Sequence, residues 1–182
     1  MLQNHRSIRH FLNAQDGFVV AEPAQLQTLT STVTKVVIKD YCCNDPSLTS
    51  WSLTACVSLK ELYIGDGCFK YCASFSVSQL PKLTKIEIGV QSFVLVDYTL
   101  VNELNIKPRP GSFEVTDCKA LQSLSIDRYS FADSCSCRLS SRHCCVQFRH
   151  RFARSGGAFV RYETGHHVGV FLWSELRALG WI

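Results

Sequence analysis

Apolar residues recur along the chain at one spacing, which is present in four copies. In the clearest copy they fall at Leu53, Cys56, Leu59, Leu62 and Ile64. The last two flank a single residue of another type, so the end of this copy predicts a short strand with both aliphatic side chains on one face. The four strands predicted in this way cover residues 36–38, 62–64, 86–88 and 124–126.

The copies follow one another at a nearly constant interval. The final isoleucines, Ile38, Ile64, Ile88 and Ile126, are 26, 24 and 38 residues apart, and the last interval equals one period of 24 plus an insertion of 14. A period in the twenties is typical of a leucine-rich-repeat solenoid, in which each coil buries its apolar face only against its neighbours. Strands from successive coils, about 4.8 Å apart, then form one parallel sheet.

An aromatic residue precedes each apolar series by two positions. The pairs Trp51/Leu53, Phe75/Val77 and Phe113/Val115 predict a second, shorter sheet on the opposite wall. The sequence therefore predicts a mainly β fold, a leucine-rich-repeat solenoid of about four coils with a parallel sheet and a short second sheet.

The segments after the strands carry a more specific signature. Residues 64–69 and 88–93 both read I-G-x-x-S/C-F, and the third phenylalanine of this kind is Phe131. Together with the series from Cys118 to Ile126, they resemble BspA-like leucine-rich repeats of the type found in protists, over about residues 30–139. The resemblance implies binding of a protein or a surface, and it supplies no catalytic residue. The chain departs from the family pattern at Leu80, Asp127 and Cys43, which replace a Cys, a Gly and a Phe.

The segments outside the repeats are less regular. Residues 1–29 form a leader or a cap, and a strand at residues 18–20 would cover the open edge of the first coil. The insertion 94–111 is expected to be a loop or small hairpin. No apolar run has the length of a signal peptide or a membrane span, so an intracellular location is the default expectation.

Residues 140–182 form a basic tail rich in Cys, His and Arg. Residues 138–182 contain 7 Lys+Arg against 2 Asp+Glu. A period of 24 would put Arg142, Cys145, Phe148 and His150 at core positions, so the repeat is expected to end and the tail to be poorly ordered. One hypothesis is an out-of-frame or intron-derived end of the reading frame. A short helix is expected over residues 174–180.

Ten cysteines and six histidines raise the question of metal binding or catalysis. Cys56 and Cys118 occupy the same repeat position, which favours a buried structural role. All six histidines lie outside the repeats, at positions 5, 10, 143, 150, 166 and 167, so no enzyme, cofactor or metal site is predicted. The densest group of metal-ligating residue types lacks the knuckle spacing of zinc sites. It comprises Cys135, Cys137, His143, Cys144 and Cys145.

The leading hypothesis is a non-enzymatic leucine-rich-repeat module that binds an unknown protein partner. The alternative is nucleic-acid or zinc binding through the tail, where 148–157 mixes Arg with aromatic residues. The predicted binding face is the outward side of the main sheet, with Tyr63 as its exposed anchor and Glu61 paired sideways with Lys85. A solvated face without a partner remains a competing interpretation. The face consists of two columns: Lys35, Glu61, Lys85 and Ser123, and then Val37, Tyr63, Glu87 and Ser125.

Overall fold

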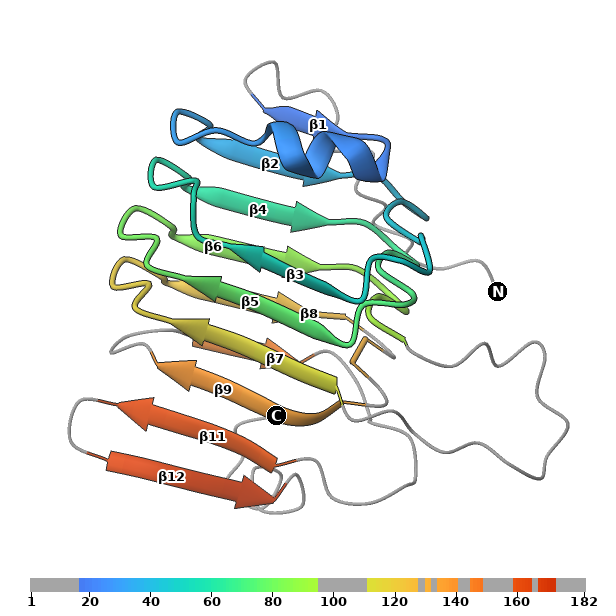
Figure 1. Cartoon of the computed structure of the whole chain (residues 1–182). Coiled ribbons are helices and arrows are strands. Elements are labelled where there is room, and N and C mark those ends of the chain that lie inside the picture. The colour runs from blue at the N-terminus through green and yellow to red at the C-terminus, as the bar shows by residue number, and fades with distance from the viewer. Residues whose placement is uncertain are drawn as a thin grey trace, which may run out of the picture.

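Two six-stranded sheets make up the described part of the protein in the computed structural model (Figure 1). Side chains are described for residues 17–94, 111–127 and 130–131, and the backbone also for residues 134–140, 145–148, 159–164 and 167–172. The first sheet has the order β1-β2-β4-β6-β8-β10, and all its neighbours are parallel. Its strands are β1 (Phe18–Val20), β2 (Lys35–Ile38), β4 (Glu61–Ile64), β6 (Lys85–Ile88), β8 (Ser123–Ile126) and β10 (Cys145–Phe148).

The second sheet has the order β3-β5-β7-β9-β11-β12, and only β11 and β12 pair antiparallel. From β2 to β11 the chain alternates between the two sheets. The single helical element of the described residues is a 3-10 helix, η2 (Pro23–Thr28). The predicted mainly β fold with a parallel sheet is thereby confirmed, although the second sheet has as many strands as the first. Its strands are β3 (Ser50–Leu53), β5 (Ser74–Ser78), β7 (Gly111–Thr116), β9 (Ser134–Ser140), β11 (Phe159–Thr164) and β12 (His167–Leu172).

The strands of the first sheet pair in the register that the repeat predicts. Leu62 lies beside Ile86 and Ile86 beside Leu124. The pairing of Ile88 with Ile126 spans the predicted insertion without a shift. The strand predicted at residues 18–20 is β1, the N-terminal edge of this sheet. Residues 1–16 and 95–110 lie outside the described part of the chain.

The core lies between the two sheets and contains two ladders of stacked aromatic rings. Phe69, Phe93 and Phe131 stack with ring centroids 4.8 and 4.6 Å apart. A second ladder of Trp51, Phe75 and Phe113 lies beside the first, and rings from the two ladders are 4.7–4.8 Å apart. Stacked rings at these distances stabilise a core by about 0.5–1.5 kcal/mol per pair beyond the area they bury.

The phenylalanine of each motif has a left-handed backbone. The φ angles of Phe69, Phe93 and Phe131 are 57°, 58° and 54°, and Cys43, the residue in this position of the first repeat, has a φ of 60°. A left-handed L-residue costs roughly 1–2 kcal/mol. Each of these phenylalanines buries its ring in the core, and that burial offsets the cost.

Two glycines of the motif lie where neighbouring repeats approach most closely. A Cβ at Gly65 would be 2.6 Å from the backbone nitrogen of Asp40, and one at Gly89 would be 2.8 Å from the carbonyl carbon of Gly65. Ordinary van der Waals contact is 3.4–4 Å. The glycines of the motif are therefore explained by close packing between repeats.

The Ser or Cys of the motif links one repeat to the next by hydrogen bonds. The Ser92 hydroxyl donates to the carbonyl oxygen of Gly65 at 2.7 Å and accepts from the Cys68 N–H at 3.2 Å. Ser130 donates to the carbonyl oxygen of Gly89 and accepts from the Ser92 N–H in the same way. Because both serines are buried, these bonds satisfy backbone groups that water does not reach.

The prediction of a poorly ordered tail is wrong for three segments. Strands β10, β11 and β12 extend both sheets, and Val146 and Phe148 pair with Leu124 and Ile126. The interval from Ile126 to Phe148 is thus 22 residues. The prediction continued a period of 24, which would put Arg142 and His150 at core positions, and for that reason ended the repeat before this strand. The helix expected over 174–180 lies outside the described residues.

Candidate binding face

Strands β2, β4, β6 and β8 bring the eight predicted residues together on one side of the first sheet, the charged face. The register places Glu61 between Lys35 and Lys85 in one column. In the other, Tyr63 lies between Val37 and Glu87. Ser123 and Ser125 of β8 continue the two columns. The register therefore confirms that the eight positions are neighbours in the sheet.

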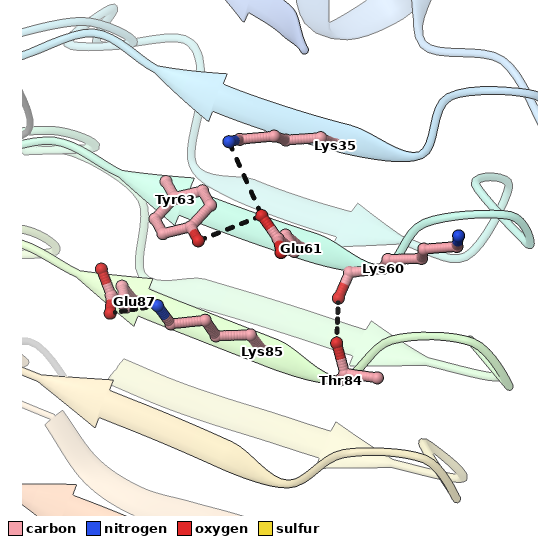
Figure 2. A network of polar contacts seen from close by, with 7 residues as sticks. All are labelled: Lys35, Lys60, Glu61, Tyr63, Thr84, Lys85 and Glu87. Atoms are coloured by element: carbon pink, nitrogen blue, oxygen red, sulfur yellow. Dashed lines mark hydrogen bonds and ion pairs between the residues drawn. The ribbon is translucent and has the colours of Figure 1, made fainter. Parts of the chain in front are cut away.

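Charged side chains surround Tyr63 on this face (Figure 2). The Tyr63 hydroxyl donates to a carboxylate oxygen of Glu61 at 3.1 Å. The ammonium nitrogens of Lys35 and Lys85 lie 5.1 and 5.2 Å from the centre of its ring. Each contact of this kind stabilises the ring by about 0.5–2 kcal/mol, depending on how far water is excluded. The lysines thus hold the tyrosine ring between them.

Two ion pairs lie on this face. Glu61 pairs with Lys35 of β2 at 3.6 Å, and Lys85 pairs at 2.8 Å with Glu87 of its own strand. The side chains of Lys85 and Glu87 are about one third exposed, so their pair contributes only about 0–1 kcal/mol. The charges are already matched within the protein, and a partner meets an electrically balanced surface.

Tyr63 is not the exposed anchor that the sequence suggested. Its side chain is only 3% exposed, and that of Val37 is 2% exposed, although both point away from the core between the sheets. The other six residues of the charged face are half-buried. A partner therefore reaches Lys85, Glu87, Ser123 and Ser125 more readily than the tyrosine ring.

Burial and charge shift the pKa values of two groups on this face. Burial raises the pKa of the Tyr63 hydroxyl above its usual value. Burial acts to lower the pKa of Lys85, but the hydrogen bond and negative charge of Glu87, together with Tyr63, raise it overall. Tyr63 stays protonated and Lys85 stays charged at neutral pH, so neither group is suited to act there as a base.

The cysteines of the described repeats are structural. All six, Cys42, Cys43, Cys56, Cys68, Cys72 and Cys118, are free thiols and buried. Burial raises the pKa of Cys68 to about 12 and that of Cys72 to about 11. The thiols of Cys68 and Cys72 are therefore protonated at neutral pH and are poor nucleophiles, because the thiolate is the reactive form.

Metal-ligating residue types do not gather in groups of three or more among the residues whose side chains the structure describes. Of the cysteine cluster in the tail, Cys135 and Cys137 lie in β9 and Cys145 lies in β10. His143 and Cys144 lie outside the described residues, so the spacing argument against a zinc site stays a prediction. Within the described chain, no helix is both long and apolar enough for a membrane crossing.

Sequence reasoning missed the outward face of the second sheet. Ser50 and Ser52 of β3 are exposed, and the hydroxyl oxygens of Ser74 and Ser112 lie 3.0 Å apart on β5 and β7. The alternation S-W-S-L and S-F-S-V-S was the available signal.

Comparison of the chain with protein-family models, with curated proteins and with solved structures finds no match.

Proposed function

We propose that this chain is a non-enzymatic leucine-rich-repeat module of the BspA-like type that binds a protein partner through the charged face. The observation that carries the proposal is the alignment of eight side chains from four strands in two columns. The array lies on hydrogen-bonded strands, so binding a partner requires little further ordering of the backbone.

The solenoid part of the proposal rests on the path of the chain. Successive strands alternate between two sheets, and each equivalent strand returns in register with the one before. The Gly, Ser/Cys and Phe of the I-G-x-x-S/C-F motif each have a contact that joins one repeat to the next. A stack of coils is stabilised by contacts between neighbouring repeats, and these motif positions supply such contacts.

The non-enzymatic part rests on the side chains that could act as nucleophiles or bases. The buried thiols of Cys68 and Cys72 are held in their protonated form, and the six histidines lie outside residues 17–131. Five side chains of the charged face form ion pairs or a hydrogen bond with one another: Lys35, Glu61, Tyr63, Lys85 and Glu87. These contacts suit a recognition surface better than a reaction centre.

A charge swap tests the binding face while its net charge stays the same. In the double variant Lys85→Glu/Glu87→Lys the ion pair of 2.8 Å is kept with its polarity reversed. We expect binding to a partner identified by cross-linking to the full chain to weaken about tenfold or more, equivalent to roughly 1.4 kcal/mol. The melting temperature should change by only a few degrees.

The matched control is Ser52→Lys, which adds a charge at an exposed position of the other sheet. It should leave the affinity unchanged. If the double variant binds as tightly as the parent while Ser52→Lys abolishes binding, the charged face is not the site. If neither change has an effect, the charged face is a solvated surface and the proposal is wrong.

A further inference from the structure

We draw no further inference here: the strongest candidate, the hydroxyl-rich outward face of strands β3, β5 and β7 (Ser50, Ser52, Ser74, Ser76, Ser112 and Thr116), is a set of small polar side chains, and nothing in the described part of the chain shows which ligand or partner covers it.

Discussion

Replacing Gly65 with alanine tests whether the close approach of neighbouring repeats sets the sequence of the turn. The added Cβ would lie 2.6 Å from the Asp40 backbone nitrogen and 2.8 Å from the Lys39 carbonyl carbon. To reach an ordinary contact of 3.4 Å, the turn after β4 must move away by about 0.8 Å, the difference between 3.4 and 2.6. The obstacle is backbone, so no rotation of a side chain relieves it.

The expected cost follows from three effects. Overpacking of this kind costs about 1–3 kcal/mol. The displacement also stretches the hydrogen bond from the Gly65 N–H to the carbonyl oxygen of Ile38, now 3.0 Å, and such a bond is worth about 0.5–1.5 kcal/mol. Alanine restricts the unfolded chain and returns about 0.4–1 kcal/mol. The sum is a loss of about 2 kcal/mol, or about 4–8 °C in melting temperature for a chain of this size.

Urea unfolding of the full chain, followed by far-UV circular dichroism, measures this loss. The control is Gly17→Ala, whose Cβ meets only the flexible side chain of Lys35, at 3.3 Å, and it should stay within about 0.5 kcal/mol of the parent. The reasoning fails if Gly65→Ala is as stable as the parent, or if both alanine variants lose the same free energy of unfolding.

Three other predictions concern buried polar groups. Ser92→Ala should lower the free energy of unfolding by about 1–3 kcal/mol because buried backbone groups lose their hydrogen-bond partner. Ser92→Cys should lower it by less. If urea unfolding gives the same loss for both variants, the hydrogen-bond explanation is excluded. Tyr63→Phe keeps the buried ring and should lower the free energy of unfolding by about 0.5–1.5 kcal/mol. Tyr63→Ala removes the ring and should lower it by about 3–5 kcal/mol. If thermal unfolding finds both variants as stable as the parent, the ring is not buried. The pKa of the Cys68 thiol rises from 9.0 to about 12 on folding. Its contribution to the free energy of unfolding is therefore fully present below about pH 9, and it is lost as the pH rises toward 12 because only the unfolded chain then releases the proton. Cys68→Ser should flatten that decline in urea midpoints, and an unchanged slope would refute the assignment.

The sequence predicted the strands of the first sheet because their spacing is constrained twice. Leu62 and Ile64 must point to the core, and they must also lie beside Ile86 and Ile88 in the next repeat. A slip of one residue would turn both side chains to the other face. Alternation and period therefore agree on a single register.

The extension of the sheets into the tail was not predictable from a fixed period. The repeat that ends at Phe148 is two residues shorter than the repeat that ends at Ile88, and a count of 24 shifts every assignment beyond Ile126. The strand positions themselves, Val146 and Phe148, do alternate as the earlier strands do. A search for alternation alone, without the period, would have found them.

The burial of Tyr63 also could not be read from the sequence. Alternation places it correctly on the outward side of β4, and an outward tyrosine is usually a surface residue. Its burial depends on where Lys35 and Lys85 direct their long side chains. Each of those side chains has several rotatable bonds, and the repeat pattern constrains none of them.

The undisturbed pairing of Ile88 with Ile126 has a consequence for how the chain tolerates insertions. Fourteen additional residues separate β6 from β8, yet the strands meet as closely in register as those of the shorter repeats. Phe93 and Phe113 stay in the ring ladders on either side of the added sequence. Closing a longer loop adds only about 0.6 kcal/mol for each doubling of its length. This connection is therefore a point where the chain can change in length while the two sheets keep their register.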